Sequence, residues 1–102
     1  MNVKLLRLTT GEDLIGDLKT SSEIGHTIEN PCIVYLSQNP ENPNGPANLG
    51  MTRWMPYAEN KEFLIDAKFV VTIAHPVEEL AKQYDGVFGA GLILPKAGLS
   101  LV

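Results

Sequence analysis

A glycine in the middle of an apolar stretch near the N-terminus constrains the fold of this chain more than any other residue. The segment VKLLRLTTGEDLIGDLKT carries apolar residues at alternating positions on both sides of Thr10-Gly11, which predicts a hairpin with its turn there. Gly16 lies inside the second strand of that hairpin. A glycine inside a strand lowers its stability, so Gly16 is expected to mark a sharp bend or a close approach of another backbone.

The next 50 residues predict further short strands. IENPCIVYLSQ is expected to be the third strand, with Cys32 and Val34 on one face and Ile33 on the other. MTRWMPYA predicts a short strand, and EFLIDAKFVVTIA predicts two apolar runs joined by a turn near Asp66-Ala67. A long loop over about residues 37–50 is expected before MTRWMPYA, because NPENPNGPANLG carries three prolines and four asparagines.

One helix and an apolar tail complete the chain. HPVEELAKQYDG predicts a helix over about residues 76–85, with Pro76 at its first position and Gly86 as its stop. One apolar stripe is expected on this helix, formed by Val77, Leu80, Ala81 and Tyr84. The tail of residues 87–102 could be an added strand, a packed arm or a partner contact. A strongly bent antiparallel sheet of about five short strands tends to close into a small barrel, which residues 3–75 are expected to form.

The composition limits the class of protein. With 102 residues, 44% of them hydrophobic, the chain is expected to be one small domain. A net charge of −4 argues against a generally basic protein that coats nucleic acid, although a local positive patch remains open. The single cysteine, Cys32, excludes an internal disulfide. The N-terminus lacks the apolar core of a signal peptide, and no segment approaches the roughly 20 apolar residues of a membrane span, so a cytoplasmic protein is expected.

Two of these segments resemble the Sm-like family. VKLLRLTTGEDLIGDLKT is similar to the opening of an Sm-like domain, which has a strand, a turn with glycine, and a bent strand with a central glycine. IDAKFVVTIAHP is similar to the second signature of the bacterial Hfq-type version, in which a lysine follows the turn and a proline ends the strand. The chain departs from that pattern at Asp66 and Ala67 in the turn, and at Phe69, where the Hfq type has histidine.

The likeness covers about residues 3–76, and the chain as a whole resembles the small Sm-like proteins encoded by marine cyanophages. It implies a five-stranded, strongly bent antiparallel barrel, here with a short C-terminal helix. It also implies homo-oligomeric rings, in which the fourth strand of one subunit pairs with the fifth strand of the next. Single-stranded RNA would lie against the inner rim, held by residues from two loops. We therefore expect a role in RNA processing or regulation, with DNA as the alternative ligand, in a bacterial host if the protein is phage-encoded.

Lys68 and Phe69 follow the predicted turn and are the first candidates for nucleic-acid binding. Lys68 would contact a phosphate, and Phe69 would stack on a base, a contact worth about 1–3 kcal/mol. The alternative for Phe69 is a core position, because it shares a face with Val71 and Ile73 in an extended strand. Since these two residues belong to the expected fifth strand, Val71 and Ile73 are also candidates for the oligomer interface.

Arg53, Trp54 and Tyr57 form the one dense group of aromatic side chains with a cation in the sequence. Arg53 and Trp54 could bind a base. Trp54 could instead be a large core residue, or lie with Tyr57 at the joint between ring subunits. His26 and Asn30 could read a base edge, or lie in a solvated turn.

No other chemistry is indicated by the sequence. It contains no CxxC, HxxxH or HExxH pattern, so neither a metal nor a cofactor is expected. No nucleophile with a matching base stands at a recognisable spacing, so an enzyme is not expected. The alternative to a nucleic-acid-binding ring is a protein–protein interaction or assembly module. The acidic balance, the loop rich in asparagine and proline, and the apolar tail all favour that alternative.

Overall fold

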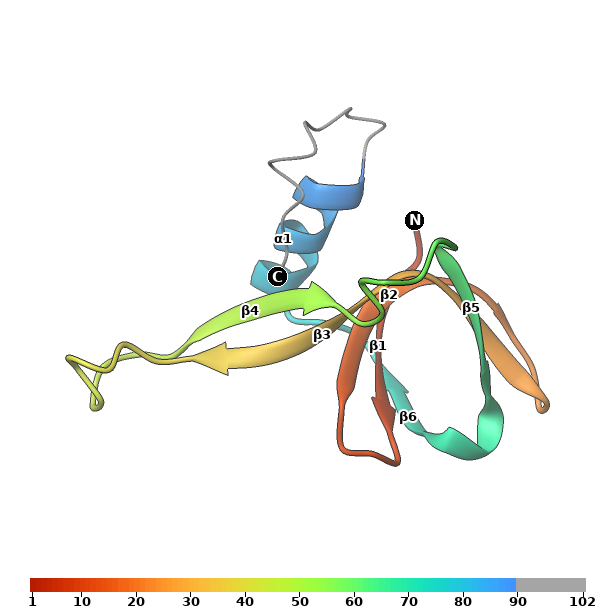
Figure 1. Cartoon of the computed structure of the whole chain (residues 1–102), viewed down its shortest axis with the longest axis horizontal. Helices are drawn as coiled ribbons and strands as arrows, with labels where there is room; N and C mark the ends of the chain where they lie inside the picture. Colours follow the sequence, from red (N-terminus) through yellow and green to blue (C-terminus); the bar gives the residue numbers. More distant parts are fainter. Residues whose placement is uncertain (90–102) are drawn as a thin grey trace.

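The computed structural model describes residues 1–89, which form one antiparallel sheet and a C-terminal helix (Figure 1). The elements in chain order are β1 Val3–Leu8, β2 Asp13–Ser21, β3 Gly25–Ser37, β4 Asn48–Arg53, β5 Glu62–Asp66, the 3₁₀ turn η1 Ala67–Phe69, β6 Val70–Ala74 and α1 Glu78–Phe88. Within the described residues, the prediction of a mainly β chain with one short helix after the strands is confirmed. The loop between β3 and β4 covers residues 38–47, inside the predicted limits.

The long strand β3 organises the sheet. The strand order is β4-β3-β2-β1-β6, and β5 pairs with the first part of β3 outside this path. The second part of β3 pairs with β4, from Cys32 to Ser37. In the described part of the chain no pairing joins β5 to β6, so the sheet is not closed. The expected closed barrel of five strands is therefore matched only in part, because the sheet has six strands and an open side.

The additional strand arises because the expected fourth strand is divided. The predicted strand MTRWMPYA ends at Arg53, and β5 begins only at Glu62. Residues 54–61, which we call the inserted segment, form no strand. Pro56 lies in this segment, and proline cannot donate to a strand ladder because it has no backbone N–H. The two halves on either side pair with different parts of β3.

Gly16 makes the close contact that its position predicts. A Cβ atom on Gly16 would lie 2.5 Å from Cγ1 of Ile28 on the neighbouring strand β3. The pairing of β2 with β3 shifts register next to this glycine, between Ile15 and Asp17. Any side chain at position 16 would therefore have to displace the buried Ile28 side chain or separate β3 from β2 where the two strands change register.

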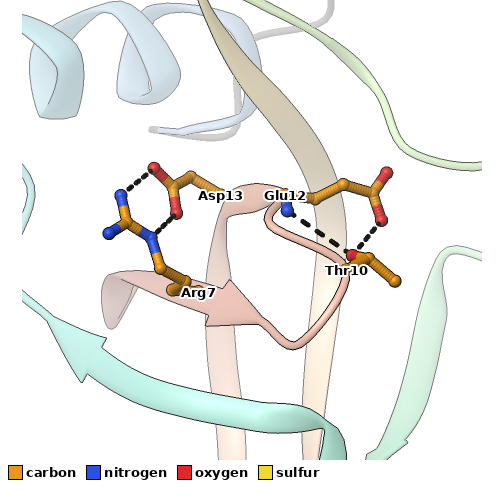
Figure 2. A network of polar contacts seen from close by, with 4 residues as sticks. All are labelled: Arg7, Thr10, Glu12 and Asp13. Atoms are coloured by element: carbon orange, nitrogen blue, oxygen red, sulfur yellow. Dashed lines mark hydrogen bonds and ion pairs between the residues drawn. The ribbon is translucent and has the colours of Figure 1, made fainter.

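Side-chain pairs hold the turn between β1 and β2 (Figure 2). Arg7 Nε and Nη2 donate hydrogen bonds to Asp13 Oδ1 and Oδ2 at 2.7 and 2.8 Å. The hydrogen bonds from the Arg7 guanidinium lower the pKa of Asp13. Thr10 Oγ1 donates to Glu12 Oε1 at 2.9 Å, and Gly11 takes a φ angle of 91°, which glycine adopts readily. The predicted hairpin is thus confirmed, with a turn that polar side chains stabilise.

Two hydrophobic clusters lie on opposite faces of the sheet, because alternate strand residues point to opposite sides. The first core cluster consists of Leu6, Leu8, Leu14, Ile28 and Ile65. The second core cluster consists of Ile15, Cys32, Met51, Leu80 and Tyr84. Cys32 and Val34 contact the second cluster and Ile33 contacts the first, so the predicted alternation along the third strand is confirmed.

The helix α1 lies next to β3 and β4 (Figure 1). Its side chains supply part of the second core cluster. It begins at Glu78, two residues after Pro76, and runs through Gly86 to Phe88. The prediction that Gly86 ends the helix is therefore wrong. Val87 and Phe88 pack against the second core cluster, and this packing outweighs the low helix propensity of glycine. Most of the predicted tail, from residue 90 onward, lies outside the described residues.

Tyr84 anchors α1 to β3. Tyr84 and Leu80 of the predicted stripe are buried, whereas Val77 is exposed. The Tyr84 hydroxyl donates to the backbone carbonyl oxygens of Glu29 and Asn30, at 3.0 and 3.1 Å. Burial raises the pKa of Tyr84, which further favours the protonated hydroxyl that donates these hydrogen bonds. The packing of α1 and the two hydrogen bonds of Tyr84 therefore hold the helix against the same part of β3.

Candidate nucleic-acid interface

Two turns lie side by side at one end of the sheet (Figure 1). The turn at residues 22–25 leads from β2 into β3 and includes Gly25, the first residue of β3. The turn at residues 66–69 leads from β5 to β6 and includes Asp66, the last residue of β5. The N–H of Ala67 donates to the carbonyl oxygen of Ile24 at 2.9 Å, and Gly25 pairs with Asp66. We call these two segments the paired turns. They bring the connection between β2 and β3 next to the turn that carries Lys68.

Short polar side chains shape both turns. Ser22 Oγ accepts hydrogen bonds from the N–H groups of Ile24 and Gly25, at 3.2 and 3.3 Å. Asp66 Oδ1 accepts a hydrogen bond from the N–H of Lys68 at 3.0 Å and so caps η1. Serine and aspartate side chains commonly bind the backbone a few residues ahead in this way. The turn predicted near Asp66-Ala67 is confirmed, and its sequence explains its conformation.

Lys68 and Phe69 present a cation and an aromatic ring to solvent. The Lys68 side chain is 71% exposed, and its Nζ lies 5.3 Å from the centroid of the Phe69 ring. Phe69 itself is 50% exposed. The core alternative for Phe69 rested on its sharing a strand face with Val71, but Phe69 ends η1 and strand β6 starts only at Val70. The 3₁₀ turn thus breaks the alternation and leaves the ring accessible for stacking.

The charge of Lys68 is partly offset by its neighbour. Asp66 Oδ2 lies 3.9 Å from Lys68 Nζ, and both side chains are at least half exposed. Exposed ion pairs of this kind contribute roughly 0–1 kcal/mol, so a phosphate can compete with Asp66 for the ammonium group. The electrostatic attraction from one such lysine is nevertheless small, and a second kind of contact is needed for affinity.

His26 joins the paired turns, together with two exposed apolar side chains. His26 pairs with Ile65 across β3 and β5, and its Nδ1 lies 2.6 Å from Ser21 Oγ. Ile24 and Leu64 are 81% and 72% exposed. Ile24 belongs to one of the turns, and Leu64 lies on β5 two residues before the other. The paired turns therefore offer a cation, an imidazole, an aromatic ring and apolar surface within one region.

Asn30 and Arg53 lie in a second, separate place. Asn30 is five residues beyond Gly25, so about 16 Å of strand separates it from the paired turns. Asn30 and Arg53 both line a cavity of about 190 Å³ beside the inserted segment. Cys32 also lines it, and burial raises the pKa of its thiol to about 11. The sequence-predicted binding residues thus divide into two groups rather than one.

The predicted interface residues differ in their surroundings. Trp54 is partly buried against the first core cluster, and its ring meets the Phe63 ring edge-on, with centroids 5.8 Å apart. Ile73 also packs against that cluster, whereas Tyr57 is fully exposed and Val71 is 61% exposed. Trp54 is therefore better described as a core residue than as an exposed ring on which a base could stack. Val71 and Tyr57 remain available for contact with another molecule.

The comparison with known protein families agrees with this arrangement. The family model of the Sm-like domain matches residues 5–85, which is most of the chain. The chain belongs to the Sm-like family. Sm-like proteins commonly bind RNA and form rings. The comparison with curated proteins finds no match, and the expected likeness to phage proteins stays a prediction.

Some residues of this Sm-like domain were not predicted to belong to a site. Ile24 and Leu64 join the paired turns, and the isolated apolar Ile24 in a polar turn was the one available signal. Lys61 and Phe63 join the cavity only through the register of β5 on β3, which no local pattern reveals. Within residues 1–89, no group of three or more His, Cys, Asp or Glu side chains could hold a metal ion. In the same residues, no helix combines the length and apolar character that crossing a membrane requires.

Proposed function

We propose that this Sm-like domain assembles into a homo-oligomeric ring that binds single-stranded nucleic acid, with RNA as its ligand, at the paired turns. The observation that carries the proposal is the backbone hydrogen bond between Ala67 and Ile24. It places exposed Lys68 and half-exposed Phe69 beside the turn that leads into His26. Stacking of a base on an aromatic ring contributes about 1–3 kcal/mol and does not depend on base identity.

The free edges of β5 and β6 support the ring. Among the described strands, β5 pairs only with β3 and β6 only with β1, so each has one unpaired edge. Exposed apolar residues accompany both edges, Leu64 on β5 and Val71 on β6. Such edges invite pairing with a strand of another chain. Pairing of β5 with β6 of the next copy is head-to-tail, and such contacts generate a closed ring when the rotation closes.

Assembly into a ring would also bring together more positive charge than one chain offers. The chain has a net charge of −4, and Asp66 partly offsets the charge of Lys68. Because Lys68 lies in the connection between the two edge strands, ring assembly would repeat it once per subunit around the central opening. Each subunit would then offer one lysine and one phenylalanine to the same strand of RNA, and the binding free energies of these contacts would add. An acidic subunit can in this way bind a polyanion locally.

The binding test is fluorescence anisotropy of labelled single-stranded RNA, single-stranded DNA and double-stranded RNA, at about 50 mM and about 200 mM salt. The test variant is Lys68→Glu, and the matched control is Lys82→Glu, an equally exposed lysine on α1. We expect Lys68→Glu to weaken binding of single-stranded RNA at least about tenfold, since it replaces an attraction with a repulsion at every subunit. Lys82→Glu should bind like the parent. Equal binding by Lys68→Glu and the parent would contradict the assignment of the site.

The assembly test is the mass in solution, measured by light scattering after size exclusion. Val71→Lys places a charge at the exposed edge of β6 and should reduce the assembly to smaller species. Lys68→Glu should leave the mass unchanged, so that loss of binding and loss of assembly are separated. A monomeric parent protein would contradict the ring.

One observation favours the alternative of a protein–protein module. The inserted segment carries fully exposed Tyr57 and half-exposed Met55. Together with Trp54 they line a shallow hollow. Aromatic and methionine side chains are enriched where proteins contact each other. Salt distinguishes the two functions, because RNA binding weakens steeply as salt rises, whereas a mostly apolar contact does not.

A further inference from the structure

A second site candidate lies between three parts of the chain, away from the paired turns. Its floor is formed by residues 30–32 of β3, one wall by the inserted segment, and the other by Phe88 at the end of α1. The cavity measures about 190 Å³. Pockets for drug-sized ligands measure roughly 300–1,000 Å³, so this cavity suits a smaller group.

The floor of this cavity is held rigidly. Asn30 has a φ angle of 50°, and its N–H donates to the carbonyl oxygen of Lys61 at 2.8 Å. The Asn30 carbonyl oxygen accepts from the Tyr84 hydroxyl, and the Pro31 carbonyl oxygen accepts from the N–H of Trp54 at 3.0 Å. The inserted segment and α1 are thus both tied to the same short piece of β3. A rigid site loses little conformational entropy when a ligand binds.

The polar groups of the cavity complement an anion with a hydrogen-bond donor. Arg53 and Lys61 line it, and neither forms an ion pair within residues 1–89. The carboxylate of Glu59 lines it as well, so the cavity carries two cations and one anion on a chain that is acidic overall. The side-chain amide of Asn30 makes no hydrogen bond to the described residues and can both donate and accept.

The apolar part of the lining suits a flat ring. Phe63 and Phe88 contribute aromatic side chains from two different elements, and Met55 adds a thioether. Phe63 is also held in place by its edge-on contact with the Trp54 ring. Nucleobases are flat, fit between apolar and aromatic side chains, and are read by amide and carboxylate groups on their edges.

We propose that this cavity binds a single nucleotide through a base that carries an amino group. The base would lie against Phe63 and Phe88, its amino group would donate to Glu59, and its phosphate would face Arg53 and Lys61. The cavity belongs to one chain, so this site goes beyond the paired turns and does not depend on ring assembly. It would let each subunit hold a base of a passing strand at a second point.

The test is ligand-observed saturation-transfer NMR of the full chain with adenosine, cytidine and uridine monophosphates. Saturable binding of the adenosine and cytidine nucleotides is expected, with uridine monophosphate bound several-fold more weakly because uracil has no amino group. The variants are Arg53→Gln and Asn30→Gly, the second chosen because glycine tolerates the positive φ angle. Arg53→Gln should raise the Kd for adenosine monophosphate about tenfold, as the loss of a hydrogen bond to a charged group does. Asn30→Gly should raise it several-fold, because it removes a neutral side-chain amide from the cavity lining.

The Lys68→Glu variant distinguishes binding at the two sites, because Lys68 is not part of the cavity. It should leave mononucleotide binding unchanged even though it weakens RNA binding at the paired turns. A failure of the ring proposal would therefore leave this result intact. No saturable signal at about 10 mM nucleotide would overturn the second site. Binding that Arg53→Gln and Asn30→Gly leave unchanged would overturn it too, and equal binding of the uridine and adenosine nucleotides would overturn the role of Glu59.

Discussion

Replacing Tyr84 with phenylalanine tests how the C-terminal helix is held on the sheet. The substitution removes one hydroxyl and keeps the buried ring, which has no solvent exposure. The carbonyl oxygens of Glu29 and Asn30 then lose a donor at 3.0 and 3.1 Å. A hydrogen bond contributes about 0.5–1.5 kcal/mol net, and a buried group left without its partner costs about 1–3 kcal/mol. We therefore expect a loss of about 1.5 kcal/mol in the free energy of unfolding.

The measurement is thermal unfolding followed by circular dichroism. For a domain of this size, 1 kcal/mol corresponds to about 4–8 °C, so Tyr84→Phe should lower the Tm by roughly 6–12 °C. Tyr57→Phe is the matched control, because the Tyr57 side chain is fully exposed and its hydroxyl makes no hydrogen bond to the described residues. Its Tm should stay within a few degrees of the parent. A Tyr84→Phe variant that unfolds like Tyr57→Phe would refute the idea that the hydroxyl anchors α1 to β3.

Two further predictions concern the first hairpin. Gly16→Ala should lower the free energy of unfolding by about 1–3 kcal/mol, because its Cβ would lie 2.5 Å from Ile28 Cγ1. The measurement is a urea titration. An unchanged midpoint would show that Ile28 moves aside at little cost. Burial of Asp17 raises its pKa, but the hydrogen bond from the Asn2 amide and the pair with Lys19 outweigh this effect, so its pKa lies below the ordinary value. The stability that this carboxylate contributes is then fully present above the unfolded-state pKa of about 3.9 and is lost as pH falls through the lower folded-state pKa. Asp17→Asn should therefore be less stable than the parent at pH 7, and the difference should shrink towards pH 2; a constant difference would contradict this coupling.

Much of the fold follows from local sequence patterns. The hairpin at Thr10-Gly11, the face alternation around Cys32 and the turn at Asp66 all depend on residues a few positions apart. The end of the helix did not follow from such a pattern. Gly86 is a frequent helix stop, but here the helix continues because Phe88 packs on the second core cluster, which lies on distant strands.

The candidate site was predictable only in part. Lys68 was expected to be exposed next to a turn, and it is. The core alternative for Phe69 depended on strand alternation, which fails because a 3₁₀ turn separates the two strands. Asn30 and Arg53 were separate candidates for nucleic-acid binding, Asn30 beside His26 in an expected turn and Arg53 beside Trp54. Asn30 and Arg53 lie at the far end of the β3–β5 pairing, beside a segment whose path no periodicity describes.

The sequence by itself determined the local elements of this protein: most of the strands, the turns, the close approach at Gly16 and a helix with one partly buried stripe. Each of these depends on backbone preferences and on the period of apolar residues, which act over a few positions. Only the tertiary structure decided that the β2–β3 and β5–β6 turns meet, that the inserted segment lines a cavity, and that β5 and β6 each have one unpaired edge among the described strands. These features depend on where β5 pairs along β3, and strand register is set by contacts between residues far apart in the chain.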